Sequence, residues 1–314
     1  MKKAVKTAAA LVSLLAIAEM GSSAYFYRRT MKRGHAKVER TTKMAGTDWN
    51  QYMDLLQTRK EYLLAQPHED VYVQSHDGLK LHATWFPVGD RKKVVICFHG
   101  YTSKGMSDYI GLSDYYLKRG YSMLLVDERA HGESEGTYIG FGCLDRHDAV
   151  KWIGWVLDIC GEDVQMLLHG TSMGGATVLM TSGLALPSQV KGIISDCAFT
   201  SAKEVFSHVL NSMYHMPAFP MIQISSLVNK KKAGYGLDDC NSAREVRKAE
   251  IPILLIHGDA DTFVPCHMCE TIYENIASEK KKLIIKGAAH AECYYKDMET
   301  YENALNEFIG GIVK

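Results

Sequence analysis

The sequence predicts an α/β fold in which a mostly parallel central sheet is covered by helices on both faces. Three observations support this class. Short continuous apolar runs recur along the chain, longer amphipathic segments separate them, and one run leads through a glycine-rich turn into a helix. Continuous apolar runs are typical of strands that are buried on both faces of a sheet. The length of 314 residues is sufficient for one large domain with small additions.

Residues 1–34 predict an N-terminal membrane anchor with a single transmembrane helix. An apolar stretch from Ala8 to Tyr27 contains one charge, Glu19, and is followed by two arginines. Twenty helical residues at about 1.5 Å each just span a bilayer core, although the acidic residue makes insertion marginal. A cleaved signal peptide is the alternative, with residues 8–18 as its apolar region and residues 22–24 as its cleavage site. In that case the mature protein would be secreted.

The sequence leaves open on which side of the membrane the domain lies. Basic residues after the apolar stretch and the scattered cysteines favour the cytoplasm, whereas the signal-like order of the N-terminus favours the opposite side. Several cysteines, such as Cys97 and Cys197, lie in buried-strand patterns and are interpreted as reduced core thiols. Cys266 and Cys269 form a CxxC pair without a second ligand pair, which predicts the first turn of a helix. We therefore expect no metal and no cofactor.

The elements follow in a regular order. Residues 35–67 predict a linker and an amphipathic helix from about Thr47 to Leu64. The domain, residues 68–314, begins with a hairpin around His76-Asp77-Gly78, because an Asp-Gly turn between strand patterns is a strong hairpin signal. Further strands are expected at 94–98, 122–126, 164–168, 190–194, 251–256 and 282–285. Helices are expected at 108–118, 144–159, 271–277 and 301–312, and directly after the glycine-rich turn.

The alternation stops between about residues 199 and 249. This segment contains helix-like pieces with aromatic and methionine side chains and a run of three lysines, Lys230 to Lys232. An insertion of this length is too long for a simple connection. We expect a helical lid over the strand ends, with a solvated surface excursion as the alternative, and we interpret the lysines as a solvated face.

The stretch from Val164 to Val178 predicts a nucleophile elbow. A strand pattern leads into Gly170-Thr171-Ser172-Met173-Gly174, and a helix of small residues follows. In such a turn the serine is held above the sheet edge, and glycines are needed where side chains would clash. Ser172 is therefore the candidate nucleophile.

A serine nucleophile needs a histidine base and a carboxylate that orients the histidine. In a fold of this kind the chain order is serine, acid, histidine. Asp261 follows the strand at 251–256, and His290 lies just beyond the last strand. We expect Asp261 to be the acid and His290 the base, whereas Asp259 stabilises the turn and Asp196 is the other candidate acid. The remaining strand-end histidines, His99, His131, His169 and His257, are interpreted as turn-stabilising residues.

Acyl transfer also needs two N–H donors for the developing oxyanion. One is expected from the main chain of Met173, directly after the nucleophile. The other is expected from the main chain of Tyr101, in the loop after the strand at 94–98.

Five motifs occur in order: HGYTS, DERAHGESEG, GTSMGG, HGDADTFVP and GAAHAE. With them, the chain from about Glu69 to Lys314 resembles the α/β-hydrolase superfamily, in particular its serine-aminopeptidase-like and acyl-esterase-like branch with a lid after the sixth strand. The resemblance implies an α/β-hydrolase fold and supports Asp261 as the triad acid. It also implies that the segment with Arg129 and His131 is a structural loop and not part of the catalytic set.

We expect a serine hydrolase that cleaves carboxylic esters through an acyl-enzyme intermediate. The alternative enzyme is a membrane-tethered serine peptidase or aminopeptidase acting on small peptides. A third possibility, a non-catalytic membrane-anchored binding module, would be indicated by a broken triad, and all three members are present. Equal numbers of basic and acidic residues, 36 each, give no reason to expect a nucleic-acid partner. The sequence leaves the oligomeric state and the acyl group open.

Overall fold

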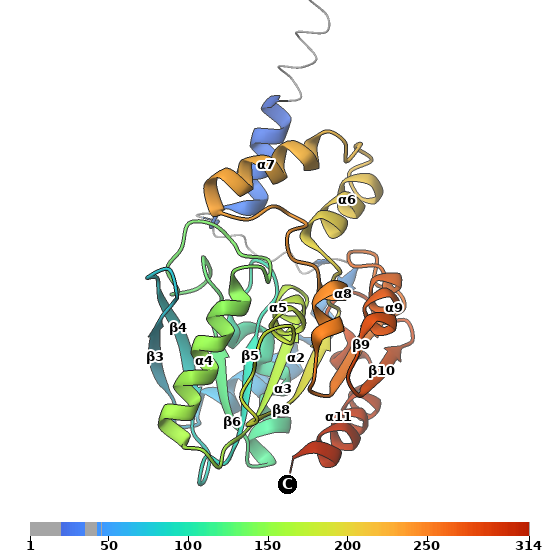
Figure 1. Cartoon of the computed structure of the whole chain (residues 1–314). Helices are drawn as coiled ribbons and strands as arrows, with labels where there is room; N and C mark the ends of the chain where they lie inside the picture. The colour runs from blue at the N-terminus through green and yellow to red at the C-terminus, as the bar shows by residue number, and fades with distance from the viewer. Residues whose placement is uncertain (1–19, 35–42, 45, 314) are drawn as a thin grey trace, which may run out of the picture.

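An eight-stranded sheet forms the centre of the protein in the computed structural model, which describes residues 20–34, 43–44 and 46–313 (Figure 1). The strand order is β10-β9-β8-β7-β5-β6-β4-β3. β3 pairs antiparallel with β4 and β4 antiparallel with β6, whereas the other neighbouring pairs are parallel. The predicted fold class, a mostly parallel sheet with helices on both faces, is confirmed.

The order of the elements agrees with the predicted alternation, whereas individual bounds within the domain differ by up to five residues, as for α9. The strands of the sheet are β3 (Glu69–Gln74), β4 (Lys80–Phe86), β5 (Lys93–Phe98), β6 (Ser122–Val126), β7 (Gln165–Thr171), β8 (Val190–Asp196), β9 (Ile253–Gly258) and β10 (Lys280–Ile285). The helices of the domain are α3 (Gly105–Lys118), α4 (Asp145–Cys160), α5 (Met173–Thr181), α6 (Ala202–Ser212), α7 (Met221–Ala233), α8 (Ser242–Glu245), α9 (Cys266–Asn275), α10 (Cys293–Lys296) and α11 (Met298–Ile312). Cys266 and Cys269 lie in the first turn of α9, as predicted.

The continuous apolar runs are explained by two cores, one on each face of the sheet. In β5, Val94, Ile96 and Phe98 point into a core formed with α4 and α9. Val95 and Cys97, at the alternate positions, point into a second core formed with α3 and α11. Because successive side chains of a strand point to opposite faces, a strand between two cores must be apolar at every position.

The segment before the sheet packs against the domain. The short strands β1 (Lys43–Met44) and β2 (Thr47–Asp48) pair with each other, and η1 (Trp49–Tyr52) leads into α2 (Met53–Leu64). Leu63 of α2 is fully buried in the core that includes α3. The Tyr52 hydroxyl donates to the Glu292 carboxylate over 2.7 Å, so the predicted amphipathic helix is fixed at both ends.

The lid, which follows the sixth strand of the sheet, carries its own apolar core. α6 and α7 contribute Phe206, Met221 and Ile222 to this cluster, and Met173, next to the candidate nucleophile, also belongs to it. The helix over residues 20–31, named the N-terminal helix below, packs against the lid at the end of the molecule opposite the C-terminus (Figure 1).

Most of the predicted membrane anchor, residues 1–19, lies outside the described residues. Within the described part, Tyr27 is buried and its hydroxyl donates to Asn229 of α7 over 3.3 Å. Phe26 packs edge-on against Phe206 of α6. Phe26 and Tyr27, at the end of the apolar stretch for which we expected a membrane span, therefore contact the lid. Among the described residues, no helix combines the length and the apolar character that crossing a membrane requires.

The interpretation of the scattered cysteines as reduced thiols holds for Cys97 and Cys197 but is wrong for one other pair. Cys143 and Cys240 form a disulfide, with Cα atoms 5.3 Å apart and 97 residues between them in sequence. The bond joins the loop before α4 to the end of the lid insertion. The other six cysteines, including Cys97 and Cys197, are free.

We expect this bond to be visible as a thiol count. The denatured protein, isolated without reductant, should take up six maleimide adducts by mass spectrometry, and eight after reduction, because only one pair is oxidised. The variant Cys143→Ser should take up seven in both conditions. Eight adducts on the unreduced wild type would contradict the disulfide.

Candidate active site

The turn between β7 and α5 holds Ser172 in a strained conformation. Its backbone has φ 55° and ψ −110°, a region that non-glycine residues rarely adopt. Two glycines make the turn possible by allowing close backbone approach. A Cβ on Gly170 would lie 2.1 Å from the carbonyl oxygen of Gly174, and a Cβ on Gly174 would lie 2.0 Å from that of Phe98. The predicted elbow geometry is therefore present, with the Ser172 side chain at the carboxyl end of β7.

The substitution Gly174→Ala should destabilise the fold because the backbone around it cannot move away from an added methyl group. We expect the free energy of unfolding to fall by about 3 kcal/mol, at the upper end of overpacking effects. Gly154→Ala in α4 is the matched control, since an added Cβ meets nothing within 4 Å there, and a helix gains up to about 1 kcal/mol from this change. Urea denaturation followed by circular dichroism measures both. Equal stability of the two variants would contradict the steric argument.

The structure brings the three predicted side chains together. Ser172 Oγ lies 2.8 Å from His290 Nε2, and His290 Nδ1 lies 2.7 Å from Asp261 Oδ2. The other carboxylate oxygen, Asp261 Oδ1, accepts the main-chain N–H groups of Phe263 and Val264 over 2.9 and 2.8 Å. All three members are buried, with 5 to 6% of each residue exposed. The hydrogen bonds form a continuous line from the carboxylate to the hydroxyl.

Burial alone would raise the pKa of Asp261, but the imidazoles of His290 and His257 hold it well below its usual value. His257 lies at the end of β9, with Nε2 3.4 Å from Asp261 Oδ2 and 2.8 Å from the carbonyl oxygen of Val264. Although burial lowers its pKa, the Asp261 carboxylate and the Cys269 thiol raise the pKa of His257 to about 11. A second histidine, with a raised pKa, therefore contacts the same carboxylate. Our interpretation of His257 as a turn-stabilising residue missed this contact, and its spacing of four residues from Asp261 was the available signal.

The other candidate acids have different neighbours. Asp259 Oδ1 accepts the N–H of Gly287 over 2.5 Å, which joins the two loops that carry Asp261 and His290. Asp196 Oδ2 accepts the hydroxyl of Tyr301 over 3.1 Å, and its main-chain oxygen accepts the N–H of Ser172 over 2.8 Å. Burial raises the pKa of Asp196 to about 6. The carboxylate that accepts from His290 Nδ1 belongs to Asp261, so the geometry favours Asp261 over Asp259 and Asp196.

The other strand-end histidines hold loops and cores in place. His99 Nε2 accepts the N–H of Glu128 over 3.0 Å, and His131 Nε2 accepts that of Thr102 over 3.2 Å. His169 lies 2.8 Å from the Tyr116 hydroxyl in the buried core. These contacts agree with structural roles.

The two expected oxyanion donors belong to segments that lie next to Ser172. Met173 is the first residue of α5, and the first N–H groups of a helix have no acceptor within it. The loop with Tyr101 passes close by, since a Cβ on Gly100 would lie 3.4 Å from Ser172 Cβ. The Tyr101 hydroxyl donates to the carbonyl oxygen of Thr30 over 3.1 Å. The end of the N-terminal helix thus holds the loop that carries the second donor.

Aromatic rings cover the site from the lid side. Tyr101 stacks on Phe141 with ring centroids 5.5 Å apart, and Phe141 packs edge-on against Phe206 at 5.1 Å. Phe263 lies over His290 at 5.0 Å. Tyr101 and Phe263 also pack against the apolar cluster of the lid, which includes Met173 next to the nucleophile.

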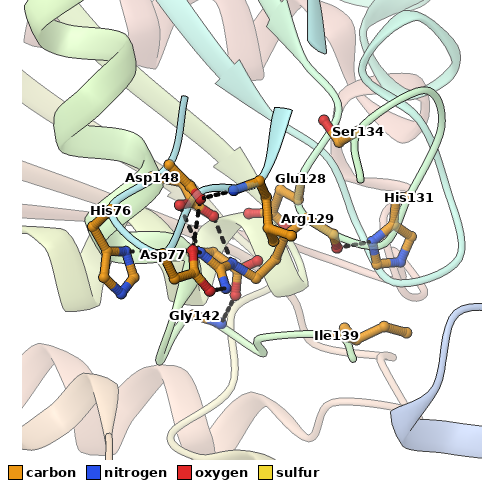
Figure 2. Close-up of polar contacts among 12 residues, drawn as sticks. His76, Asp77, Glu128, Arg129, His131, Ser134, Ile139, Gly142 and Asp148 are labelled. Atoms are coloured by element: carbon orange, nitrogen blue, oxygen red, sulfur yellow. Dashed lines mark hydrogen bonds and ion pairs between the residues drawn. The ribbon is translucent and has the colours of Figure 1, made fainter. Parts of the chain in front are cut away.

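Arg129 anchors the structural loop that follows β6 (Figure 2). Its guanidinium donates to Asp148 over 2.6 and 2.7 Å and to Asp77 over 2.9 and 3.1 Å. His76, Asp77 and Asp148 are close enough together to hold a metal ion, but the Arg129 guanidinium already donates to both carboxylates. Figure 2 shows Arg129 between the two aspartates, which agrees with a structural role for this segment.

Glu128, beside Arg129, should make stability depend on pH. Burial and the nearby Asp145 and Asp148 carboxylates raise its pKa well above the usual 4.5. Above pH 4.5 the unfolded chain releases this proton while the folded chain keeps it, so the folded state binds more protons and loses stability as pH rises.

In the variant Glu128→Gln this group cannot ionise, so the variant does not lose stability in this way as pH rises. Its free energy of unfolding, relative to wild type, should therefore increase by about 1.4 kcal/mol per pH unit between pH 4.5 and the folded-state pKa. Urea denaturation at pH 5, 6 and 7 measures the trend. Glu250→Gln, at an exposed position, is the control and should show a constant difference. A difference that is also constant for Glu128→Gln would contradict the raised pKa.

Comparisons with known proteins agree with this architecture. The family model for the alpha/beta hydrolase fold matches residues 93–231. The uncharacterised protein YqkD of Bacillus subtilis is 27% identical over 220 residues, which cover 70% of this chain and 72% of YqkD. The lysophosphatidylserine lipase ABHD12 of Rattus norvegicus is 23% identical over 69% of this chain, and the match spans 56% of that lipase. The esterase Pf2001 of Pyrococcus furiosus superposes with a TM-score of 0.66 at 22% identity, over 81% of this chain and 94% of the esterase.

Proposed function

We propose that the chain is a serine hydrolase that cleaves carboxylic esters with Ser172, His290 and Asp261, a proposal supported by its α/β-hydrolase fold and by the match of the alpha/beta hydrolase family model to residues 93–231. The observation that supports this most strongly is the hydrogen-bonded line from Asp261 through His290 to a serine on a strained elbow. A buried hydroxyl bonded to an imidazole is activated for attack, since the imidazole can take its proton.

The proposed steps follow from the positions of the groups. Ser172 Oγ attacks the ester carbonyl while His290 Nε2 takes its proton, and the main-chain N–H groups of Tyr101 and Met173 stabilise the oxyanion. His290 then donates the proton to the leaving alkoxide, and the acyl-enzyme forms. Water, deprotonated by His290, attacks the acyl carbonyl, and the acid is released when the bond to Ser172 Oγ breaks and His290 returns the proton to Oγ. Asp261 accepts the Nδ1–H of His290 throughout and stabilises the imidazolium.

The surroundings of Ser172 favour an apolar acyl group. Tyr101, Phe141, Phe263 and Met173 line the lid side of the nucleophile or lie in the same apolar cluster. An alkoxide leaves with less acid assistance than an amine, which favours esters over peptides. Pf2001 is named an esterase and ABHD12 a lipase, and both names are consistent with ester substrates for this chain.

We also propose that the protein attaches to a membrane through residues before the N-terminal helix. The sequence from Ala8 to Ala18 is apolar, and the N-terminal helix holds the chain against the lid at the point where it leaves the described residues. Mass measurement of the mature chain tests this attachment. A product that begins near Tyr25 would contradict an uncleaved anchor and support the signal-peptide alternative.

A substrate panel tests the reaction class. The full chain is expected to hydrolyse p-nitrophenyl esters, with kcat/KM increasing from acetate to medium acyl chains, and to react with a fluorophosphonate probe. Aminoacyl anilides in the same panel test the peptidase alternative. Cleavage of the anilides at higher kcat/KM than every ester would overturn the ester proposal, and absence of both activities and of labelling would overturn the hydrolase.

A further inference from the structure

Exposed apolar side chains gather on one face of the protein. Of the ten large hydrophobic residues that are strongly exposed in the described part of the chain, seven belong to the lid or the N-terminal helix. They are Met20, Tyr25, Met213, Tyr214, Met216, Phe219 and Leu227, and we name this surface the apical face. Figure 1 shows these elements together at the end of the molecule opposite the C-terminus.

The packing of the lid does not account for the apical face. α7 buries Met221 and Ile222 against the lid core, whereas Phe219 and Leu227 are each 71% exposed. Residues 213–217, in the connection between α6 and α7, are all exposed and include two methionines and Tyr214. A lid that only covered a site would bury one side and present polar residues on the other. Exposed apolar patches of this kind mark interaction surfaces.

The charge around the apical face indicates the kind of partner. Residues 20–34 and 202–235 contain eight lysines and arginines but one acidic residue, Glu204, although the whole chain has 36 of each sign. Lys230 pairs with Asp239, and Arg33 binds main-chain oxygens of the loop after β6. Arg28, Arg29 and Lys231 are exposed. Apolar side chains bordered by basic ones are complementary to a bilayer that carries anionic lipids.

The course of the chain identifies the same partner. The N-terminal helix runs past α7, and the residues that precede it in sequence are apolar from Ala8 to Ala18. A bilayer that received this apolar stretch would lie against the apical face, because the helix is fixed to the lid by Tyr27 and Phe26. A soluble partner would leave the apolar N-terminal stretch unexplained.

We propose that the apical face docks on the surface of an anionic bilayer, with Tyr214, Phe219 and Leu227 in the headgroup region and the neighbouring basic residues on the lipid phosphates. The lid would then lie between the bilayer and Ser172, which is 6% exposed below it. An acyl chain could leave the bilayer beside Phe206 and reach Tyr101 along the stacked rings. This route makes amphiphilic lipid esters the substrate class and rests on the proposed hydrolase function, whereas the docking itself does not.

Fluorescence quenching by brominated lipids tests the docking on the full chain. Phe219→Trp is compared with Tyr72→Trp, a matched control at an exposed aromatic position on the edge strand β3, and both share the background of four native tryptophans. In vesicles of brominated phosphatidylcholine with phosphatidylglycerol, we expect strong additional quenching for Phe219→Trp only. Equal quenching of both variants, or vesicle binding without quenching at position 219, would overturn the proposal. The second result would mean that the N-terminal stretch binds alone.

Charge and activity variants separate the remaining alternatives. The double variant Arg28→Glu and Lys231→Glu should raise the lipid concentration that gives half-maximal quenching at position 219 about tenfold. If the double variant needs the same lipid concentration as wild type, the electrostatic part of the proposal is wrong. A dimer in size-exclusion chromatography that Phe219→Ser abolishes would show that the face binds a second copy instead. Ser172→Ala should lose esterase activity and still dock, which would show that docking does not depend on catalysis. A wild-type protein that docks but is inactive would reject only the proposed hydrolase function.

Discussion

Replacing Ser172 with alanine is expected to lower kcat for p-nitrophenyl acetate about a million-fold, to the level left by substrate binding and the oxyanion donors. The expectation follows from the 2.8 Å contact between its hydroxyl and His290, because no other nucleophile forms the acyl-enzyme in the proposed mechanism. The variant should keep its fold, since the elbow depends on Gly170 and Gly174 and not on the hydroxyl. Stopped-flow and endpoint assays measure kcat, and circular dichroism measures the fold.

Ser182→Ala is the matched control for this experiment. Ser182 lies at the other end of α5, is also buried, and donates its hydroxyl to the carbonyl oxygen of Leu179 over 2.6 Å. Ser182→Ala should keep kcat within a few-fold of wild type, although it loses the stability that this hydrogen bond contributes. If Ser172→Ala retained more than a hundredth of the wild-type kcat, another nucleophile would have to be sought.

Those parts of the site that are dictated by local geometry could be predicted from the sequence. The spacing of Gly170, Ser172 and Gly174 predicted the elbow, because backbone atoms approach both glycines to about 2 Å of where a Cβ would stand. His290 could be found because few histidines follow the strand that ends before Asp261. The lid was predicted from the interruption of the strand and helix pattern, and its core of aromatic and methionine side chains agrees with that interpretation.

Contacts between distant segments could not be predicted in this way. Cys143 and Cys240 are 97 residues apart and occur at no framework spacing, so only the three-dimensional arrangement reveals their bond. Tyr27 has the amphipathic character of a membrane-interface residue, and the same character allows its ring to pack on the lid while its hydroxyl binds Asn229. His257 reads as an ordinary strand-end histidine until the fold places it 3.4 Å from the Asp261 carboxylate.

The second large effect is expected for Asp261→Asn, which should lower kcat about 10⁴-fold while leaving the shape of the site intact. An asparagine can present its N–H₂ group to His290 Nδ1, which selects the tautomer with the proton on Nε2. That tautomer cannot accept the Ser172 proton, so the hydrogen bond is kept and the base is lost. The change also removes the negative charge that raises the pKa of His257. Steady-state assays with p-nitrophenyl esters measure the loss.

Asp259→Asn and Asp196→Asn show whether the loss is specific to position 261. Asp259 lies two residues away and accepts the main-chain N–H of Gly287, so its amide variant should keep kcat within a few-fold of wild type. Asp196 contacts the elbow through its main-chain oxygen, which the substitution leaves in place, and its carboxyl accepts the Tyr301 hydroxyl. Since an amide oxygen can accept the same bond, Asp196→Asn should affect stability more than kcat. The reverse pattern, an active Asp261→Asn with an inactive Asp196→Asn, would assign the acid to β8 and would require His290 to turn away from the 2.7 Å contact seen here.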